Sequence, residues 1–290
     1  MNQLKGEVVD AVSQNGNLGD YEKARESFNW EAIESNFSWF DTGKVNMAYE
    51  AIDRHAESSR KDKVALYYSD QQRDESYTFS QLKTTSNQFG NVLRKLGVNK
   101  GDRFFIFMPR TPELYMALLG AIKIGAVVGP LFEAFMEMAV RDRLQDSEAV
   151  AIITTPALVH RIPTAELPNL KHVIVVGEDL DLQEGQVDFH KEMAQASEEL
   201  DIEWVDREDG LILHYTSGST GKPKGVFHVH NAMVQHYYTG NIVLDLKEDD
   251  VYWCTADPGW VTGTSYGIFA PWLNGATNVI RGGRFSPQDW

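Results

Sequence analysis

A dodecapeptide rich in glycine, hydroxyl and lysine side chains is the stretch of this sequence best suited to chemistry. Residues 215–226, YTSGSTGKPKGV, hold three glycines, four Ser or Thr residues and two lysines. Glycines let the backbone turn several N–H groups toward one point, while hydroxyls add donors and lysines add positive charge. An ordinary surface loop is the alternative. The combination over the whole dodecapeptide favours a cradle for a polyphosphate.

The spacing of these residues excludes the two most familiar phosphate loops. A Walker loop requires a glycine five positions before its Gly-Lys pair and a Ser or Thr directly after the pair. This sequence has Thr216 and Pro223 at those positions. Gly218 and Gly221 do not match the dinucleotide fingerprint G-x-G-x-x-G either. The polyphosphate cradle must therefore be of another kind.

The dodecapeptide closely resembles the phosphate-loop motif of the adenylate-forming superfamily, which includes acyl-CoA synthetases, adenylation domains of peptide synthetases and luciferases. The resemblance implies that this loop wraps the β- and γ-phosphates of ATP while a carboxylate attacks the α-phosphate. It gives Thr216 and Lys222 catalytic roles, because they would hold and neutralise the leaving pyrophosphate, and it places Thr220 close to Mg²⁺. The residues that it implies for nucleotide binding are Thr216, Ser217, Gly218, Ser219, Thr220, Gly221, Lys222 and Lys224.

A second motif, ADPGWVTG at residues 256–263, narrows the resemblance. A tryptophan, a valine and a threonine between glycines make a small, rigid and mostly apolar pocket with one hydrogen-bond donor. A tryptophan that is simply buried in a strand-to-helix turn is the alternative. The motif looks like the acyl-substrate motif of acetyl-CoA synthetases within the superfamily. That likeness implies that Trp260, Val261 and Thr262 shape an acetate pocket, and that Thr262 also lies near the acyl-adenylate and acts in catalysis.

The identity of the acid stays open at this point. Pro258 stands where the commonest version of the motif has valine, so propionate is an alternative to acetate. One methylene in an apolar pocket changes binding by only ~1–3 kcal/mol.

A weaker likeness concerns coenzyme A. Family members have a Phe-Gly-Gly-Phe-like turn that contacts the CoA nucleotide, and this sequence has FEAF at residues 132–135, without the glycines and with a carboxylate added. A basic residue after the next strand meets the CoA phosphates in the family, and Arg161 is the nearest match. By resemblance we expect Phe132 and Arg161 to contact CoA. Arg141 and Arg143 fit equally well as surface residues of a helix.

Three histidines after the dodecapeptide suggest a metal site, which their spacing does not support. His228, His230 and His236 form H-x-H-x₅-H, which matches no common zinc pattern, and neither a second cysteine nor H-E-x-x-H accompanies them. We expect one histidine to pack behind the phosphate loop and the others to lie on the surface or on a helix face.

The composition restricts the partners and the compartment. A formal charge of −15 argues against nucleic acid and anionic membranes, which need basic patches. The single cysteine excludes a disulfide framework, the polar and acidic first twenty residues do not form a secretory signal, and no apolar run is long enough to span a membrane. We expect a cytoplasmic protein that binds a small carboxylic acid, ATP and CoA.

Strand-like and helix-like segments alternate along the chain. This alternation is typical of βαβ units with a parallel sheet covered on both faces, whose ligands bind beyond the carboxyl ends of the strands. Ser80 is expected to cap one of the helices. Strands are predicted at 64–68, 104–108, 126–128, 150–154, 173–176, 211–214 and 251–256, and helices at 47–56, 82–96, 112–125, 139–145 and 232–244.

The resemblance implies an α/β fold with the layered βαβ sheets of the large N-terminal domain of adenylate-forming enzymes, in incomplete form. Residues 1–45 are expected to form an arm that packs on the main body, and residues 46–290 the N-terminal part of the AMP-binding domain. Family enzymes run to more than twice this length and carry a small C-terminal domain. We therefore expect a truncated acetate–CoA ligase (AMP-forming), inactive alone. The alternatives are another short- or medium-chain acyl or aryl ligase, an adenylation domain, or a non-catalytic nucleotide-binding remnant.

Overall fold

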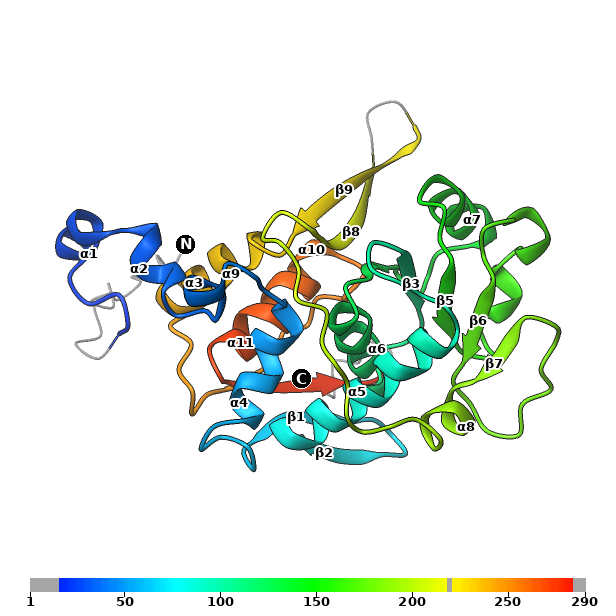
Figure 1. The fold of residues 1–290 in the computed structure, drawn as a ribbon, viewed down its shortest axis with the longest axis horizontal. Coiled ribbons are helices and arrows are strands. Elements are labelled where there is room, and N and C mark those ends of the chain that lie inside the picture. Colours follow the sequence, from blue (N-terminus) through cyan, green and yellow to red (C-terminus); the bar gives the residue numbers. More distant parts are fainter. Residues whose placement is uncertain (1–15, 218–220, 284–290) are drawn as a thin grey trace, which may run out of the picture.

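The computed structural model describes residues 16–217 and 221–283, arranged as two β-sheets with helices between and around them (Figure 1). The strands are β1 (Val64–Ser69), β2 (Asp74–Thr78), β3 (Arg103–Phe107), β4 (Val127–Pro130), β5 (Ala151–Thr154), β6 (His172–Val175), β7 (Gln186–Asp188), β8 (Gly210–Ser217), β9 (Pro223–Val229), β10 (Val251–Tyr252) and β11 (Thr277–Arg281). The α-helices are α1 (Tyr21–Ser27), α2 (Trp30–Glu34), α3 (Trp39–Thr42), α4 (Arg54–Ala56), α5 (Phe79–Lys95), α6 (Pro112–Lys123), α7 (Glu137–Asp146), α8 (Phe189–Met193), α9 (Ala232–Ile242), α10 (Val261–Thr264) and α11 (Ala270–Leu273). Short 3₁₀ or π segments are η1 (Tyr49–Asp53), η2 (Val159–Arg161), η3 (Thr164–Glu166) and η4 (Ser265–Phe269).

The larger sheet has the strand order β7-β6-β5-β3-β4-β8-β9. Its neighbouring strands run parallel except for β9, which pairs antiparallel with β8. The prediction of a parallel βαβ sheet is confirmed for the strands up to β8. It missed β9, because the residues of this strand were assigned to the phosphate loop and the segment that follows it.

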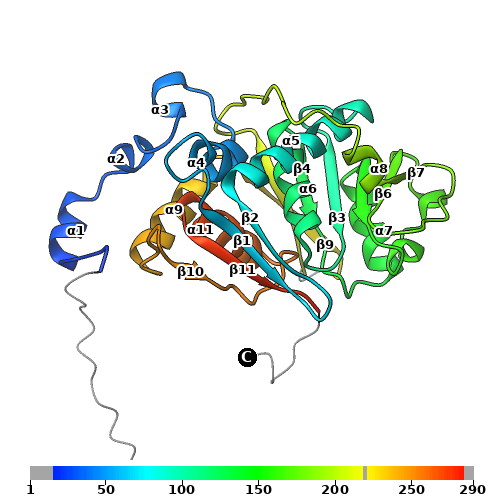
Figure 2. The same ribbon diagram turned by 90° about the horizontal axis from the view of Figure 1, so that it is seen from below.

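The smaller sheet has the order β10-β11-β1-β2. β11 joins β1 and β10 in parallel, whereas β1 and β2 form an antiparallel pair. The strand predicted at 251–256 is wrong beyond Tyr252, where β10 ends. Figures 1 and 2 show α5 and α6 between the two sheets.

Helix α6 forms the centre of this layer, and each of its residues is buried. A helix that is apolar all round belongs in such a position. Its contact with α5 is close enough to require glycine, because a Cβ on Gly120 would lie 2.6 Å from the carbonyl oxygen of Ser86 and 2.9 Å from the nitrogen of Gly90. Pro112 begins α6 as predicted. A capping box formed by Thr78 and Gln81 begins α5, so the predicted cap at Ser80 is wrong by two residues.

Apolar side chains fill both faces of the larger sheet. Strand β3 was predicted to be buried on both faces, and its alternate residues indeed enter two different clusters: Phe104 and Ile106 face α5 and α6, while Phe105 and Phe107 face the side that α7 covers. This packing leaves the carboxyl ends of β4 and β8, which are neighbours in the sheet, at one edge of the molecule. Phe132 follows β4, and the predicted phosphate loop begins within β8.

The first described residues form short helices that contact the rest of the molecule. Phe37 and Trp39 stack at 4.7 Å and are buried, and the ring of Phe37 meets Tyr237 of α9 edge-on at 5.1 Å. A bridge joins Val45 to Val205, which lies in the long segment between α8 and β8. These contacts place the helices α2 and α3 against α9, on the side of the molecule where Figure 1 shows the blue segment.

Candidate active site

The predicted phosphate loop is the end of a two-stranded hairpin. Strands β8 and β9 pair so that Thr216 lies opposite Lys224 and Ser217 opposite Pro223. The predicted strand end at His214 is therefore wrong: pairing with β9 extends β8 to Ser217. Figure 1 shows the hairpin projecting from the body of the molecule. The predicted ligands Gly218, Ser219 and Thr220, including the residue assigned to Mg²⁺, lie outside the described residues.

The described residues near the hairpin end are open to solvent. Thr216, Lys222 and Lys224 are exposed, and neither lysine forms an ion pair with a residue of the described part of the chain. Gly221 has φ +85°, a backbone conformation that favours glycine. No atom lies within 4 Å of the place where its Cβ would stand, so there would be space for a side chain. The hairpin thus offers two cations that have no ion-pair partner among residues 16–217 and 221–283, in a strongly acidic chain.

Lys222 also borders a cavity beside α7. The cavity has a volume of about 580 Å³ and separates the hairpin from the helix. Its lining consists of Arg141, Asp142, Gln145, Asp146, Lys222 and Pro223.

Tyr215, the first residue of the dodecapeptide, anchors the hairpin to α7. Its hydroxyl donates a hydrogen bond to Oδ2 of Asp146 at 2.7 Å. Burial, followed by this hydrogen bond, raises the pKa of Tyr215. The guanidinium of Arg143 lies 4.2 Å from the ring centroid of Phe135 and 5.7 Å from that of Tyr215. Arg143 is thus packed between two aromatic rings and is not the surface residue that the sequence allowed.

The second motif forms a compact loop that leads into α10. The backbone N–H of Gly259 donates to Oδ1 of Asp257 at 2.7 Å, and the N–H of Trp260 donates to the carbonyl of Asp257 at 2.9 Å. Thr264 Oγ1 donates to the carbonyl of Pro258 at 2.8 Å. A Cβ on Gly263 would lie 2.1 Å from the carbonyl oxygen of Asp257, so only glycine fits there. We call residues 257–264 the acid loop.

The three side chains assigned to the acid lie on the outer surface of this loop. Trp260 is 51% exposed, Val261 is 39% exposed, and Thr262 is exposed. A tryptophan buried in a turn, the alternative weighed above, therefore does not describe Trp260. Each of the three side chains is therefore open to solvent within the described residues. Burial raises the pKa of the Asp257 carboxyl, which lies beneath them.

The two motifs meet at the edge where β4 and β8 end. His214, next to the dodecapeptide on β8, is buried, and the backbone of Gly259 forms a hydrogen bond with it. A Cβ on Gly259 would lie 2.5 Å from the nitrogen of Phe132, directly after β4. The acid loop therefore contacts the chain directly after β4 and His214 of β8, three residues before β8 ends; ligands of open α/β sheets bind near the carboxyl ends of the strands.

The sequence prediction missed His214, since a histidine inside an apolar strand carries no motif. Its ring centroid lies 5.7 Å from that of His228 on β9, and His236 of α9 lies 5.3 Å from Tyr266. Burial, followed by the charge of His228, lowers the pKa of His214 and of His236 to about 4. These imidazoles are neutral at neutral pH. Within residues 16–217 and 221–283, no cluster of three His, Cys, Asp or Glu side chains is arranged to hold a metal ion.

His230 lies apart from these rings and packs behind the sheet. It is buried, and its Nδ1 accepts a hydrogen bond from the backbone N–H of Met47 at 3.1 Å. Burial lowers the pKa of His230 to about 3. This histidine ties β9 to the start of the segment that follows the arm.

The two residues expected to contact CoA lie beside the acid loop. Phe132 packs against Trp260 with ring centroids 5.8 Å apart. Nη1 of Arg161, at the end of η2, donates to the carbonyls of Glu133 and Phe135, each at 3.2 Å. The structure thus brings Phe132 and Arg161 together with Trp260.

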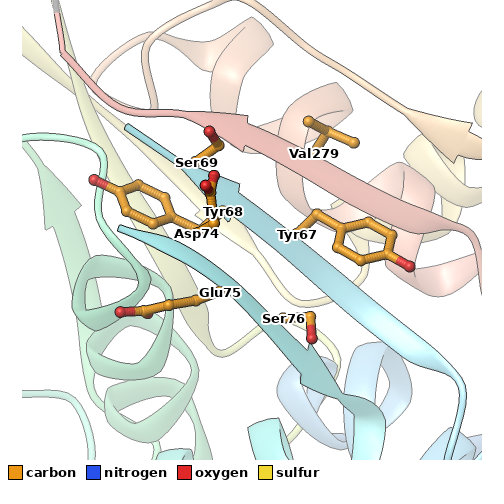
Figure 3. A pocket seen from close by; sticks show the side chains of 7 residues that line it. All are labelled: Tyr67, Tyr68, Ser69, Asp74, Glu75, Ser76 and Val279. Atoms are coloured by element: carbon orange, nitrogen blue, oxygen red, sulfur yellow. The ribbon is translucent and has the colours of Figure 1, made fainter. Parts of the chain in front are cut away.

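A separate cavity of about 330 Å³ lies on the smaller sheet and contains none of the predicted site residues (Figure 3). It is lined by Tyr67, Tyr68, Ser69, Asp74, Glu75, Ser76 and Val279.

No helix among the described residues is long and apolar enough to cross a membrane.

Comparisons with known proteins show which family the chain resembles. A sequence model described as "AMP-binding enzyme" matches residues 52–290. Acetyl-coenzyme A synthetase of Bacillus subtilis strain 168 is 63% identical over 284 residues, which are 98% of this chain and 50% of that protein. Acetyl-coenzyme A synthetase of Rubrobacter xylanophilus is 39% identical over 273 residues, covering 88% of this chain and 42% of that protein.

A solved structure supports the fold in the same way. The crystal structure of Brucella canis acyl-CoA synthetase matches with a TM-score of 0.86 at 30% identity, covering 93% of this chain and 49% of that one. The chain therefore spans about half the length of the curated relatives that it matches.

Proposed function

The chain belongs to the AMP-binding enzyme family, and we propose that it carries the nucleotide- and acid-binding half of an acetate–CoA ligase (AMP-forming). In the proposed reaction a carboxylate oxygen of acetate attacks the α-phosphorus of ATP, and the bond to pyrophosphate breaks. The CoA thiolate then attacks the carbonyl carbon of acetyl-AMP and displaces AMP. The single observation that carries this proposal is the meeting of the two motifs at the ends of β4 and β8, through His214, Gly259 and Phe132.

The hairpin residues supply charge and hydrogen bonds to the leaving pyrophosphate. Transfer reactions at phosphorus are catalysed mainly by positioning and by stabilisation of negative charge. Lys222 and Lys224 are exposed and unpaired within the described residues, so they are available for a polyphosphate. Thr216 adds a hydroxyl between them and the body of the sheet. In a chain with a formal charge of −15, these two cations are the local attraction that a polyanion needs.

The acid loop supplies the second substrate site. Trp260 and Val261 offer an apolar wall and Thr262 a hydroxyl, on a loop that its own hydrogen bonds hold. We assign acetate to this wall because the acetyl-coenzyme A synthetases share the chain's sequence most extensively among the relatives named above. Propionate is the alternative, since the wall sets no limit on one further methylene within the described residues.

Magnesium and CoA complete the proposed set of ligands. Thr220 would stand close to Mg²⁺, and that residue lies outside the described part of the chain. The described residues contain no three-ligand cluster for a metal, so the binding proposed for this half rests on hydroxyls, amides and lysines. The contacts of Phe132 and Arg161 favour a role at the acid loop over the expected contact with CoA.

The remaining proposals concern the setting of the chain. We place it in the cytoplasm, in keeping with the lone free cysteine, Cys254. Residues 1–45 are proposed as an arm and residues 46–290 as the N-terminal part of the AMP-binding domain. Because the chain spans half of its relatives' length, turnover is proposed to need the part that it does not match, including a small C-terminal domain.

Pyrophosphate binding to the purified chain tests the nucleotide site directly. We expect binding by calorimetry, weakened about tenfold by Lys222→Gln, because a charge-assisted hydrogen bond contributes about 1.5 kcal/mol. Lys247→Gln is the matched control: it removes the same charge, but Lys247 is paired with Asp245 at 2.8 Å, away from the hairpin. If both variants weaken pyrophosphate binding equally, the binding depends on the net charge of the chain alone, and the proposed site at the hairpin is refuted.

Acetate-dependent exchange of pyrophosphate into ATP tests the reaction. The chain is assayed alone and after addition of the C-terminal half of the Bacillus subtilis relative. We expect exchange only in the mixture, faster with acetate than with propionate or benzoate. Faster exchange with an aryl or longer acid would show that this acid, and not acetate, is the substrate. Nucleotide binding without exchange in either sample would favour a non-catalytic protein.

A further inference from the structure

The turn between β4 and α7, residues 132–135, encloses the guanidinium of Arg161. Nη1 of Arg161 donates to the carbonyls of Glu133 and Phe135, each at 3.2 Å. Nε of the same side chain is buried without a hydrogen-bond partner among the described residues. The carbonyls of the second and fourth residues of the turn share this one donor group, so Arg161 adds to the turn's own hydrogen bond from the N–H of Phe135 to the carbonyl of Phe132 at 3.0 Å. The 28 residues of sequence between Glu133 and Arg161 make this a tertiary contact.

A second arginine, Arg143, contacts the aromatic side chain of Phe135 at the end of the turn. The guanidinium of Arg143 lies 4.2 Å from the ring centroid of Phe135, within the range of a cation–π contact. The rings of Phe135 and Phe132 meet edge to face at 5.9 Å, an arrangement that aromatic pairs prefer. The orientation of Phe132 is therefore set by contacts on the turn itself.

Phe132 transmits this orientation to the acid loop. Its ring lies 5.8 Å from the indole of Trp260 at an angle of 45°. Its backbone touches that of Gly259 so closely that a Cβ there would stand 2.5 Å from the Phe132 nitrogen. Trp260 is half exposed, and Phe132 is its one aromatic neighbour within the described residues. A shift of the turn must therefore move the indole.

We propose that Arg161 is a positioning residue for acid recognition: acting through the turn 132–135 and the ring of Phe132, it fixes the indole of Trp260 and thereby the size of the short aliphatic carboxylate that the acid loop accepts. Both hydrogen bonds of Nη1 go to carbonyls of the turn, which ties this part of the guanidinium to the turn. The acid in this statement rests on the proposed function, whereas the link from Arg161 to Trp260 does not.

Fluorine NMR of the chain labelled with 5-fluorotryptophan tests the link. The chain has seven tryptophans, and the resonance of Trp260 is assigned by its loss in Trp260→Phe. Arg161→Gln and Phe132→Leu are expected to shift or broaden this resonance while those of the buried Trp39 and Trp272 stay in place. Arg141→Gln is the matched control, because Arg141 pairs with Asp142 and Glu166 on the surface and does not contact the turn.

Hydrogen exchange gives a second readout of the same variants. The amides of Trp260 and Thr264 are protected by hydrogen bonds within the acid loop. We expect Arg161→Gln and Phe132→Leu each to raise their exchange rates by roughly fivefold to tenfold, the effect of losing the order of one loop. Combining the two substitutions should add little, because both break the same connection. Arg161→Lys, which keeps a donor, should restore part of the protection.

The outcomes separate this proposal from the proposed function. If acetate shifts the Trp260 resonance of the unsubstituted chain and butyrate does not, the acid site holds; if neither does, the acid site fails while the link from Arg161 is still measured by the substitutions. An unchanged Trp260 resonance and unchanged exchange in both variants would overturn the link. A common shift of Trp39, Trp260 and Trp272 would show loss of folding instead of loss of position, and would overturn it equally.

Discussion

Replacement of Gly259 by alanine should loosen the whole site, because this glycine is where the acid loop touches the end of β4. A Cβ at this position would lie 2.5 Å from the nitrogen of Phe132, 2.7 Å from its Cα and 2.9 Å from the carbonyl carbon of Leu131. These are backbone atoms, which cannot rotate away as the end of a side chain can. The loop and the strand end must therefore separate.

The size of the effect follows from these distances. Ordinary van der Waals contact begins at 3.4 Å, so the loop must move by about 0.9 Å from its present 2.5 Å approach. Overpacking of this kind costs typically ~1–3 kcal/mol. A displacement near 1 Å between reacting groups can also lower a rate by about a hundredfold. We expect Gly259→Ala to lose ~1–3 kcal/mol in the free energy of unfolding and most acetate-dependent exchange.

Urea unfolding of the purified chain measures the first effect, and the exchange assay with the complementary half measures the second. Gly267→Ala is the matched control in the same segment: its nearest atoms belong to the Cys254 side chain at 3.3 Å, and alanine favours helix over glycine by up to about 1 kcal/mol. The control should change stability by no more than about 1 kcal/mol. Equal behaviour of the two variants would refute the claim that backbone contact at Gly259 positions the loop.

Three further predictions concern stability. Lys123→Met should lower the free energy of unfolding, measured with urea, by ~3–5 kcal/mol, because it leaves the fully buried carboxylate of Asp53 without its cation at 2.7 Å. The reasoning fails if the double variant with Lys123→Met and Asp53→Ala is no more stable than Lys123→Met alone. Stability should fall as the pH drops from about 6.5 to about 3, since burial lowers the pKa of His230 from 6.5 to about 3 and only the unfolded chain gains the proton in that window; His230→Gln should weaken this dependence in acid-unfolding curves without removing it, because the lowered pKa values of His55, His214 and His236 contribute to the same window. Tyr215→Phe should lose ~0.5–1.5 kcal/mol and raise hydrogen exchange along β8, because its 2.7 Å hydrogen bond to Asp146 holds the hairpin; unchanged exchange would count against that anchor.

Local signals were sufficient for several elements of the fold. The apolar run at 104–108 predicted a strand buried on both faces, which is β3, and Pro112 predicted the start of α6. The nearby cap was placed wrongly at Ser80, because both Thr78 and Ser80 are good caps and only the reciprocal bonds of Thr78 with Gln81 decide between them. Such choices depend on where the preceding strand ends, which residue type alone does not specify.

The hairpin shows a different limit of sequence reasoning. Its glycines and hydroxyls obscured β9, whose residues Pro223 to Val229 include exposed Val226 and Phe227 and lack a buried apolar pattern. This strand forms because it pairs with β8 at the edge of the sheet, and pairing is a property of two segments together. The sequence indicated the polyphosphate chemistry of the loop but did not predict the hairpin that carries it.

The sequence by itself determined which groups are available for chemistry: the hydroxyls and lysines of residues 215–226 and the small apolar loop around Trp260. Local composition suffices for this, because glycine spacing and side-chain type set what a loop can bind. Only the tertiary structure decided that Arg161 holds the turn of Phe132 and that Phe132 packs against Trp260. These contacts join segments that follow β4, β5 and β10, and the packing of the strands brings together residues whose distance along the chain carries no signal.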